Sequence, residues 1–481
     1  MVFSSTIFIF LFMPVSVLIY YCLYKSRRLQ NVFLVLVSMV FYTWDKPKYV
    51  LLLIGSIIGN YFLGIWMEKS RKSPNKARFA VITSVVLNLG LLFVFKYIPF
   101  TLSNVNLILP QPVPIPDIPF PVGISFFTFQ AISYIVDVKR GRIAAQRSFI
   151  DLALYISFFP RLLQGPIIRY QTMVDQLRNR KETFHDFSEG FCRFVIGLGK
   201  KVLLASLLGS LVNEAFGPGY TQLSVGMAWL GMFAGSFYVY FDFSGYSDMA
   251  IGLGRMFGFK MPENFNYPYI ATSVADFWRR WHITMSAWFK DYVFLPLVIG
   301  NAFKRYPFTK KLMPVASKLV VAMFITWFCT GIWHGASWNY IAWGMYYFFL
   351  MRLETHLPKL KSSTLNIAFG FIFTQLAVKF GQVLTRSSGL LAALEYYKNL
   401  FGFKGHPVID DRFLYYLNQD KWVLLACIVA SMPTVKFMLK YIKINENLQK
   451  VIYASWIISV FIFSTAYIIK NGYTPFLYGK Y

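Results

Sequence analysis

The chain has 481 residues, of which 56% are hydrophobic, 19% aromatic and only 14% charged. A soluble domain has roughly 25% charged residues, so this composition excludes a soluble multidomain enzyme, and its hydrophobicity excludes disorder. The 48 Lys and Arg against 21 Asp and Glu give a net charge of +27. In polytopic membrane proteins, basic residues collect in cytoplasmic loops and contact anionic headgroups. We therefore attribute the positive charge to contacts with lipid headgroups and expect no nucleic acid partner.

Long apolar runs recur along the chain, and about 20 such residues span a bilayer as a helix. We predict an all-α polytopic membrane protein with about 11–13 transmembrane helices. The twelve runs are 3–24, 29–44, 49–67, 79–98, 118–136, 190–213, 225–247, 317–334, 336–351, 365–384, 421–442 and 451–469. The whole chain, 1–481, is interpreted as one membrane domain. Its N-terminal helices lie in 1–136, its core in 137–351, and its C-terminal helices and tail in 352–481.

The charges between the first runs predict the orientation. Segments 25–31, 67–78 and 139–147 hold 3, 5 and 4 Lys or Arg, whereas 45–48 and 99–117 hold 2 and 0. Positive charge favours the cytoplasmic side. We therefore expect a multi-pass protein of the bacterial cell (inner or plasma) membrane with both termini extracytoplasmic. The first apolar run lacks a preceding positive charge, which favours a retained helix over a cleaved signal peptide.

Two segments depart from simple spans. Segment 149–170 is apolar but contains Pro160 and Pro166 and is flanked by basic residues. A re-entrant helix pair on the cytoplasmic side fits this pattern, and a plain kinked helix is the alternative. Segment 276–293 places aromatic residues at helical spacing on one face. We expect one amphipathic, interfacial helix there.

His334 is the most informative ionisable residue. It lies in the sequence GIWHGASW, within residues 319–351, which contain no Asp, Glu, Lys or Arg. Charge is costly in a bilayer, so an intramembrane histidine marks a candidate functional site, and burial favours its neutral form. A general base and a core histidine bonded to a backbone carbonyl are equally compatible with the spacing. The flanking Gly331 and Gly335 are expected to let a substrate approach the backbone.

Further polar candidates follow a long apolar run. His282 lies beside Arg279 and Arg280, either as an interfacial residue or with a part in the chemistry. Asp242 and Asp248 are expected to pair with those two arginines rather than to bind a cation or orient a histidine. The sequence has no metal-ligand spacing, nucleotide-binding loop or serine-hydrolase motif, so we expect no metal and no bound cofactor. The four cysteines, Cys22, Cys192, Cys329 and Cys427, are expected to be free and buried.

Several motifs carry a resemblance to a known family. They are the run 241–300, which contains WRRWH at 278–282, then GIWHGASW at 331–338, FFP-x4-GPIIRY at 158–170, MVFSS at 1–5 and PFLYGKY at 475–481. The resemblance covers nearly the whole chain. The sequence resembles the bacterial membrane-bound O-acyltransferases, and within them the membrane subunits of alginate O-acetylation. It departs from that pattern at 345–347, 380–386 and 298–301, which leaves the polymer undetermined.

The resemblance implies a funnel-shaped helical bundle with a central tunnel that joins a cytoplasmic acyl donor to an extracytoplasmic acceptor. His334 and His282 are then the catalytic histidines. The substrate-binding residues are Arg279, Arg280, Trp281, Trp333, Asp242 and Asp248. The donor is acetyl-CoA or another acyl thioester, and the acceptor is an exopolysaccharide or a cell-wall polymer. An extracytoplasmic SGNH-type acetyltransferase or a similar protein is the expected partner.

The C-terminal sequence contains Tyr478, which is either part of an interfacial anchor or a relay that carries the acyl group. Two other functions remain open at this stage. One is D-alanyl transfer to teichoic acid from an acylated carrier protein. The other is a transporter or lipid flippase, which would explain the helices but not the paired histidine motifs.

Overall fold

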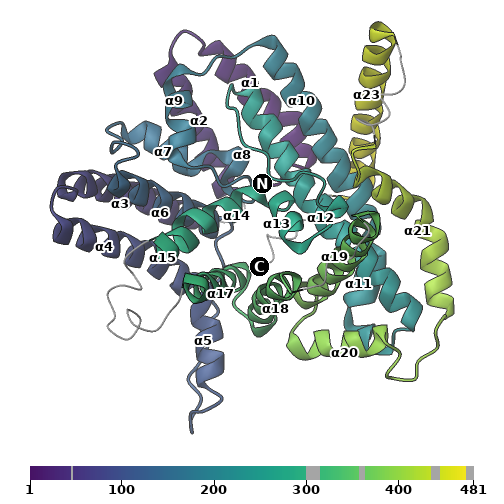
Figure 1. The fold of residues 1–481 in the computed structure, drawn as a ribbon. Helices are drawn as coiled ribbons and strands as arrows, with labels where there is room; N and C mark the ends of the chain where they lie inside the picture. Colours follow the sequence, from purple (N-terminus) through teal and green to yellow (C-terminus); the bar gives the residue numbers. More distant parts are fainter. Residues whose placement is uncertain (45–46, 300–314, 357–362, 435–444, 473–481) are drawn as a thin grey trace. The chain divides into compact units, whose positions relative to one another are not determined.

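A computed structural model describes residues 1–44, 47–299, 315–356, 363–434 and 445–472. Within these ranges the chain forms helices and no strands. It divides into two compact units: Met1–Val195 with Tyr246–Pro262, and Ile196–Gly245 with Glu263–Lys470. This division does not test the prediction of a single membrane domain. Figure 1 shows the helices with the labels used below.

The first unit contains the N-terminal helices. They are α1 (Met13–Cys22), which continues a π-helical turn at Phe8–Phe12, α2 (Arg27–Thr43), α3 (Tyr49–Ser70), α4 (Pro74–Leu92), α5 (Ile98–Val105), α6 (Ile124–Arg140), α7 (Phe149–Ser157), α8 (Phe159–Leu162), α9 (Tyr170–Asn179) and most of α10 (Phe184–Gly199). A second π-helical turn, Phe93–Tyr97, joins α4 to α5.

The second unit contains the later helices. They are α11 (Gly209–Phe216), most of α12 (Val225–Met256), α13 (Val274–Arg280), α14 (Ile283–Phe289), α15 (Leu295–Ile299), α17 (Val315–His334), α18 (Trp338–Glu354), α19 (Ser363–Arg386), α20 (Leu390–Leu400), α21 (Asp411–Ala430) and α23 (Glu446–Asn471). Short 3-10 or π-helical turns lie at Lys200–Ala205, Ser206–Leu208, Pro218–Gln222, Pro268–Ile270 and Lys290–Phe294.

Five helical stretches among the described residues are long and apolar enough to cross a membrane. They are Tyr49–Ser70, Pro74–Val105, Phe184–Phe216, Thr364–Arg386 and Glu446–Asn471. This confirms the predicted all-α, multi-pass membrane class. The total of 11–13 spans stays a prediction. The four cysteines are free, as expected, but Cys22 is exposed and only Cys427 is buried.

Segment 149–170 does not form one continuous helix. Helix α7 ends at Ser157, and Phe158 adopts a non-helical backbone conformation, with φ −51° and ψ 109°. Helix α8 begins with Pro160 in its first turn, where the missing N–H of proline costs no hydrogen bond, and it ends at Leu162. The chain then runs without helix to Tyr170. The side of the membrane on which this broken pair enters and leaves stays a prediction.

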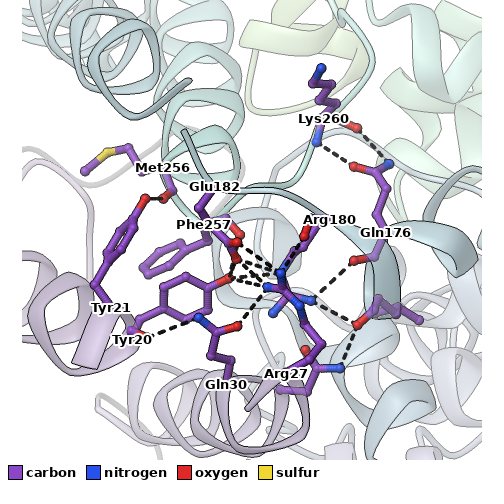
Figure 2. A network of polar contacts seen from close by, with 12 residues as sticks. Tyr20, Tyr21, Arg27, Gln30, Gln176, Arg180, Glu182, Met256, Phe257 and Lys260 are labelled. Atoms are coloured by element: carbon purple, nitrogen blue, oxygen red, sulfur yellow. Dashed lines mark hydrogen bonds and ion pairs between the residues drawn. The ribbon is translucent and has the colours of Figure 1, made fainter. Parts of the chain in front are cut away.

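A polar network ties together distant parts of the first unit (Figure 2). Glu182 pairs with Arg27 at the start of α2. The hydroxyl of Tyr20 accepts a hydrogen bond from Arg180 Nε at 2.9 Å, and its proton is shared between Glu182 Oε1 and the backbone oxygen of Phe257, which lies 2.9 Å away. Burial acts to raise the pKa of the Glu182 carboxyl, but hydrogen bonds from Arg27 and Tyr20 outweigh burial and lower it. The network therefore holds the N-terminal helices against the chain that follows α9.

Candidate active site

The predicted continuous helix over 276–293 is wrong, because the backbone changes direction at His282. Helix α13 ends at Arg280 and α14 begins at Ile283. His282 lies between them in the left-handed conformation, with φ 42°. A residue other than glycine rarely adopts this conformation, and such strain concentrates at functional sites. His282 therefore does not belong to the single helical face that the aromatic spacing predicted.

Asn264 holds the chain in this broken conformation. Its backbone oxygen accepts the N–H of Ile283 at 3.0 Å, while the Asn266 N–H donates to the Arg280 oxygen at 2.9 Å. Its side-chain oxygen Oδ1 accepts both the backbone N–H of Thr284 at 3.3 Å and the Thr284 hydroxyl at 2.9 Å. Asn264 thereby caps the first turn of α14 from a neighbouring loop. Nothing in its sequence pattern indicated this role.

These contacts fix the tautomer of His282. A backbone N–H can only donate, so the Asn264 atom that faces Thr284 is the carbonyl oxygen. The same oxygen lies 3.0 Å from His282 Nδ1, which therefore carries the proton and donates. The other ring nitrogen, Nε2, is buried and has no hydrogen-bond partner in the described part of the chain. His282 lies outside the five apolar stretches, and burial lowers its pKa to about 3. The ring is neutral, and Nε2 can accept a proton or a hydrogen bond.

His334 is the last residue of α17 and is 8% exposed. Three aromatic rings surround its imidazole. The ring centroids of Trp343 and Trp333 lie 4.8 and 4.9 Å away at steep angles, and the ring of Tyr340 is nearly parallel at 6.5 Å. The residue thus lies in an apolar, aromatic environment, as its position in an uncharged stretch predicted.

The glycines near His334 let two helices pack closely, and the approach of a substrate to their backbone stays a prediction. A Cβ atom on Gly331 would lie 2.6 Å from the backbone oxygen of Tyr340. A Cβ atom on Gly335 would overlap the Tyr340 ring, and one on Gly344 would overlap the backbone of Trp327. Small residues let α17 and α18 approach closely, which places the His334 ring against its aromatic neighbours.

The structure brings the two histidines into one cluster. The Trp333 ring lies 4.9 Å from His334 and 6.3 Å from His282, and the Phe243 ring lies 4.7 Å from His282 on another side. We call Phe243, His282, Trp333, His334 and Trp343 the histidine cluster. Its members come from α12, the α13–α14 break, α17 and α18, so the cluster joins segments that are far apart in the chain.

Of the predicted binding residues, the tryptophans line the cluster and the arginines do not. Trp281 is 6% exposed and packs on Phe265 and Phe277, and Trp333 is 5% exposed. Arg279 and Arg280 both pair with Asp276, with N–O distances of 3.3 and 2.8 Å, and the Arg279 side chain is 73% exposed. Any role of these arginines in donor binding stays a prediction.

The two aspartates have ion-pair partners other than the predicted arginines. Asp242 pairs with Lys201, and both side chains are buried. Asp248 pairs with Arg193, at 2.9 Å. The prediction of ion pairing is therefore confirmed, but its partners were wrong. Lys201 was overlooked, although a lysine within the apolar run 190–213 was a visible signal.

Two further expectations concern residues elsewhere. Tyr478 lies outside the described residues. Within the described ranges, no group of three or more His, Cys, Asp or Glu residues is arranged to hold a metal ion. The described site brings together two imidazoles, several aromatic rings and the amide of Asn264.

Comparison with known proteins identifies the class of this site. Residues 139–362 match the model of the membrane-bound O-acyltransferase family. The chain is 38% identical to a probable alginate O-acetylase of Pseudomonas aeruginosa, over 84% of this chain and 75% of that protein. It is 32% identical to a peptidoglycan O-acetyltransferase of Helicobacter pylori, over 93% and 89% of the two chains. It is 34% identical to a teichoic acid D-alanyltransferase of Bacillus subtilis, over 58% and 69%.

The chain belongs to the membrane-bound O-acyltransferase family. It is therefore an O-acyltransferase of the membrane, which confirms the resemblance noted in its motifs and excludes the transporter alternative. Both histidines of the cluster lie inside the matched range.

Proposed function

We propose that the protein moves an acetyl group from a cytoplasmic thioester, acetyl-CoA, across the membrane to a hydroxyl group of an extracytoplasmic polysaccharide. The observation that carries the proposal is the pairing of two buried imidazoles in one aromatic cluster, with His282 held as a neutral proton acceptor. The similarity to alginate and peptidoglycan O-acetyltransferases over most of the chain supports a polymer acceptor.

The proposed reaction needs a base and a dry site. His334 accepts the proton of the acceptor hydroxyl while the oxygen of that hydroxyl attacks the thioester carbonyl. A C–O bond forms, the C–S bond breaks, and the proton passes from the imidazolium to the leaving thiolate. The products are an O-acetyl ester and a free thiol. The aromatic rings around His334 exclude water, which would otherwise hydrolyse the donor.

His282 and its surroundings are assigned to the donor. Its bare Nε2 accepts a hydrogen bond, for which the amide N–H groups of a pantetheine arm are suitable donors. Trp281 and Trp333 form apolar walls for that arm, and Arg279 and Arg280 are placed to attract donor phosphates. Asp242 and Asp248 act through their ion pairs and take no chemical step.

The purified protein tests this function directly. Acetyl-CoA carrying a labelled acetyl group is supplied with membrane-derived polymer and with an extracytoplasmic SGNH-type acetyltransferase, the proposed partner. We expect thiol release and label on the polymer, both of which require the protein. An intact thioester under all these conditions would overturn the proposal.

A second candidate function is D-alanyl transfer, which the similarity to teichoic acid D-alanyltransferases favours. Parallel reactions with a D-alanylated carrier protein distinguish the two donors.

The proposed direction of transfer depends on the orientation of the chain. We expect a cysteine placed at Asn104 to react with an impermeant thiol reagent in intact cells, and one placed at Ser73 to react only after lysis. The reason is the excess of basic residues in 67–78 over 99–117. The four native cysteines are first replaced by serine, because Cys22 is exposed. The reverse labelling pattern would invert the direction of acyl transfer.

A relay through Tyr478 is the alternative to direct attack by the acceptor hydroxyl: the Tyr478 hydroxyl takes the acyl group and passes it to the external partner. A phenol ester is more reactive than a sugar ester, so a neutral imidazole acting on the hydroxyl can load and unload it. Tyr478→Phe removes only the hydroxyl. We expect it to abolish polymer acetylation and to remove a labile acetyl adduct that mass spectrometry detects on the wild-type C-terminal peptide. An active Tyr478→Phe protein would leave Tyr478 as an interfacial anchor and the transfer direct.

A further inference from the structure

Helix α19 carries four polar side chains on one face, within a stretch apolar enough to span the membrane. They are Gln375, Lys379, Gln382 and Arg386. Their spacing of four, three and four residues places them in one row along the helix. We call these four residues the α19 polar row. Nothing in the proposed acyl transfer uses them so far.

Lys379 is a buried cation without an acidic partner in the described ranges. It is 4% exposed, and its Nζ donates to Gln375 Oε1 at 3.0 Å. The Nζ also lies 4.8 Å from the centre of the Tyr269 ring and 5.3 Å from that of Phe233. A charge in this position is costly and usually marks a functional site.

Arg386 repeats this arrangement two turns further along α19. Its guanidinium lies 5.1 Å from the centre of the Tyr238 ring and 5.7 Å from that of Phe216, and it too forms no ion pair with a described carboxylate. Three buried polar atoms in the row have no hydrogen-bond partner in the part of the chain the structure describes. They are Arg386 Nε, Gln375 Nε2 and Gln382 Oε1. The row thus offers two cations, two free N–H donors and one free acceptor.

The row lies beside two segments that adjoin members of the histidine cluster in the chain. At the Arg386 end, Asn339 Nδ2 donates to the backbone oxygens of Leu384 at 3.0 Å and Ser387 at 3.2 Å. Asn339 belongs to the first turn of α18, directly after the loop that follows His334. In the middle of the row, Lys379 lies over the Tyr269 ring, which is 6.5 Å from the ring of Trp281, the neighbour of His282.

We propose that the α19 polar row is a binding site for an oxyanion, a carboxylate or a phosphate, carried by the acyl acceptor. Guanidinium and ammonium groups are the usual partners of these anions, and the free Gln382 Oε1 suits a neighbouring hydroxyl. The acceptor fits better than the donor because the Arg386 end adjoins the segment of His334, which takes the proton from the acceptor. This inference rests on the proposed function and narrows its substrate to an acidic polymer.

The test measures ligand-induced stabilisation of the purified protein, which needs no catalysis. The probes are glucuronate and glycerol 3-phosphate, with glucose and glycerol as neutral counterparts at equal ionic strength. We expect at least one anionic probe to raise the melting temperature of the wild type more than its neutral counterpart does, because a ligand that binds only the folded state stabilises it. We expect Lys379→Met to lose this increase and Arg386→Met to reduce it.

Lys421→Met is the matched control. Lys421 also bonds an amide oxygen, that of Asn418 at 2.7 Å, and also lies over an aromatic ring, that of Trp422 at 6.0 Å, but it is exposed. This variant should keep the full response. Lys379→Met without probe should be at least as stable as the wild type, because it removes an unpaired buried charge.

Three results would overturn the inference. The first is that neither anion stabilises the wild type, and the second is that Lys379→Met responds to the anions as the wild type does. The third is a Lys379→Met protein that loses only its stabilisation by coenzyme A, because that result would assign the row to the donor. The proposed function fails separately, through an intact thioester in the wild type. A wild-type enzyme that cleaves acetyl-CoA but shows no anion response would refute the row alone.

Discussion

His334→Ala should lower the rate of acyl transfer by about 100- to 10,000-fold, which is the usual contribution of a general base. The ring lies at the end of α17 among the aromatic rings of Trp333, Tyr340 and Trp343. The loss should appear in kcat, since the base acts in the transition state and not in binding. The measurement is thiol release from acetyl-CoA together with label on the polymer.

The control for His334 is another histidine in the same unit. His356 is exposed and its Nδ1 faces the backbone oxygen of Arg352 at 2.8 Å, outside the histidine cluster. His356→Ala should keep normal activity. The yield and melting temperature of His334→Ala should match the wild type closely, so that a loss of activity reports chemistry. Near-normal transfer by His334→Ala would remove this residue from the reaction.

Asn264→Ala should lower activity by about 10- to 100-fold, as is typical when a residue that orients a catalytic imidazole is lost. The Asn264 oxygen accepts a hydrogen bond from the Nδ1–H of His282. Without it the ring can adopt the other tautomer, in which Nε2 carries the proton and can no longer accept a hydrogen bond. If His282 positions the donor, the loss should appear mainly as a raised KM for acetyl-CoA. His282→Ala should show the same signature, and the double variant should lose no more than His282→Ala alone.

Asn264→Asp separates positioning from simple structural support. A carboxylate still accepts the Nδ1 proton and the Thr284 hydroxyl, so activity near neutral pH should recover relative to Asn264→Ala. The new negative charge favours the imidazolium and therefore raises the pKa of His282 from its low native value of about 3. A neutral Nε2 is then lost at a higher pH than in the wild type. The acid limb of the pH–rate profile should move upward, and an unchanged limb with full activity would show that Asn264 only supports the fold.

The class of the protein was predictable from the sequence because it depends on local properties. Apolar length indicates membrane helices whatever their packing, and the absence of charge from 319–351 indicates that His334 lies in an apolar environment. The break in segment 149–170 was equally visible, since proline and glycine act on the backbone where they stand. The paired histidine motifs indicated the family, which the comparisons confirm.

The arrangement of the site depends on contacts between segments that are far apart in the chain. The aromatic spacing in 276–293 favoured a continuous helix, but hydrogen bonds from the loop at Asn264 outweigh that local preference and turn the chain at His282. Asp242 pairs with Lys201 because α12 packs beside the turn at Lys200–Ala205, which charge patterning cannot foresee.

Local patterns in the chain were thus enough to predict a helical membrane protein, and the motif resemblance added the acyltransferase family and singled out two of the five histidines. These patterns could not show which nitrogen of His282 accepts a hydrogen bond. They also could not show that Lys379 and Arg386 form no ion pair with a described carboxylate. The proton position on His282 depends on the Asn264 oxygen, and the ion pair of Asp242 depends on Lys201, which lies 41 residues away in the chain. Both need atoms that folding brings within about 3 Å of each other, and spacing along the sequence carries no record of that distance.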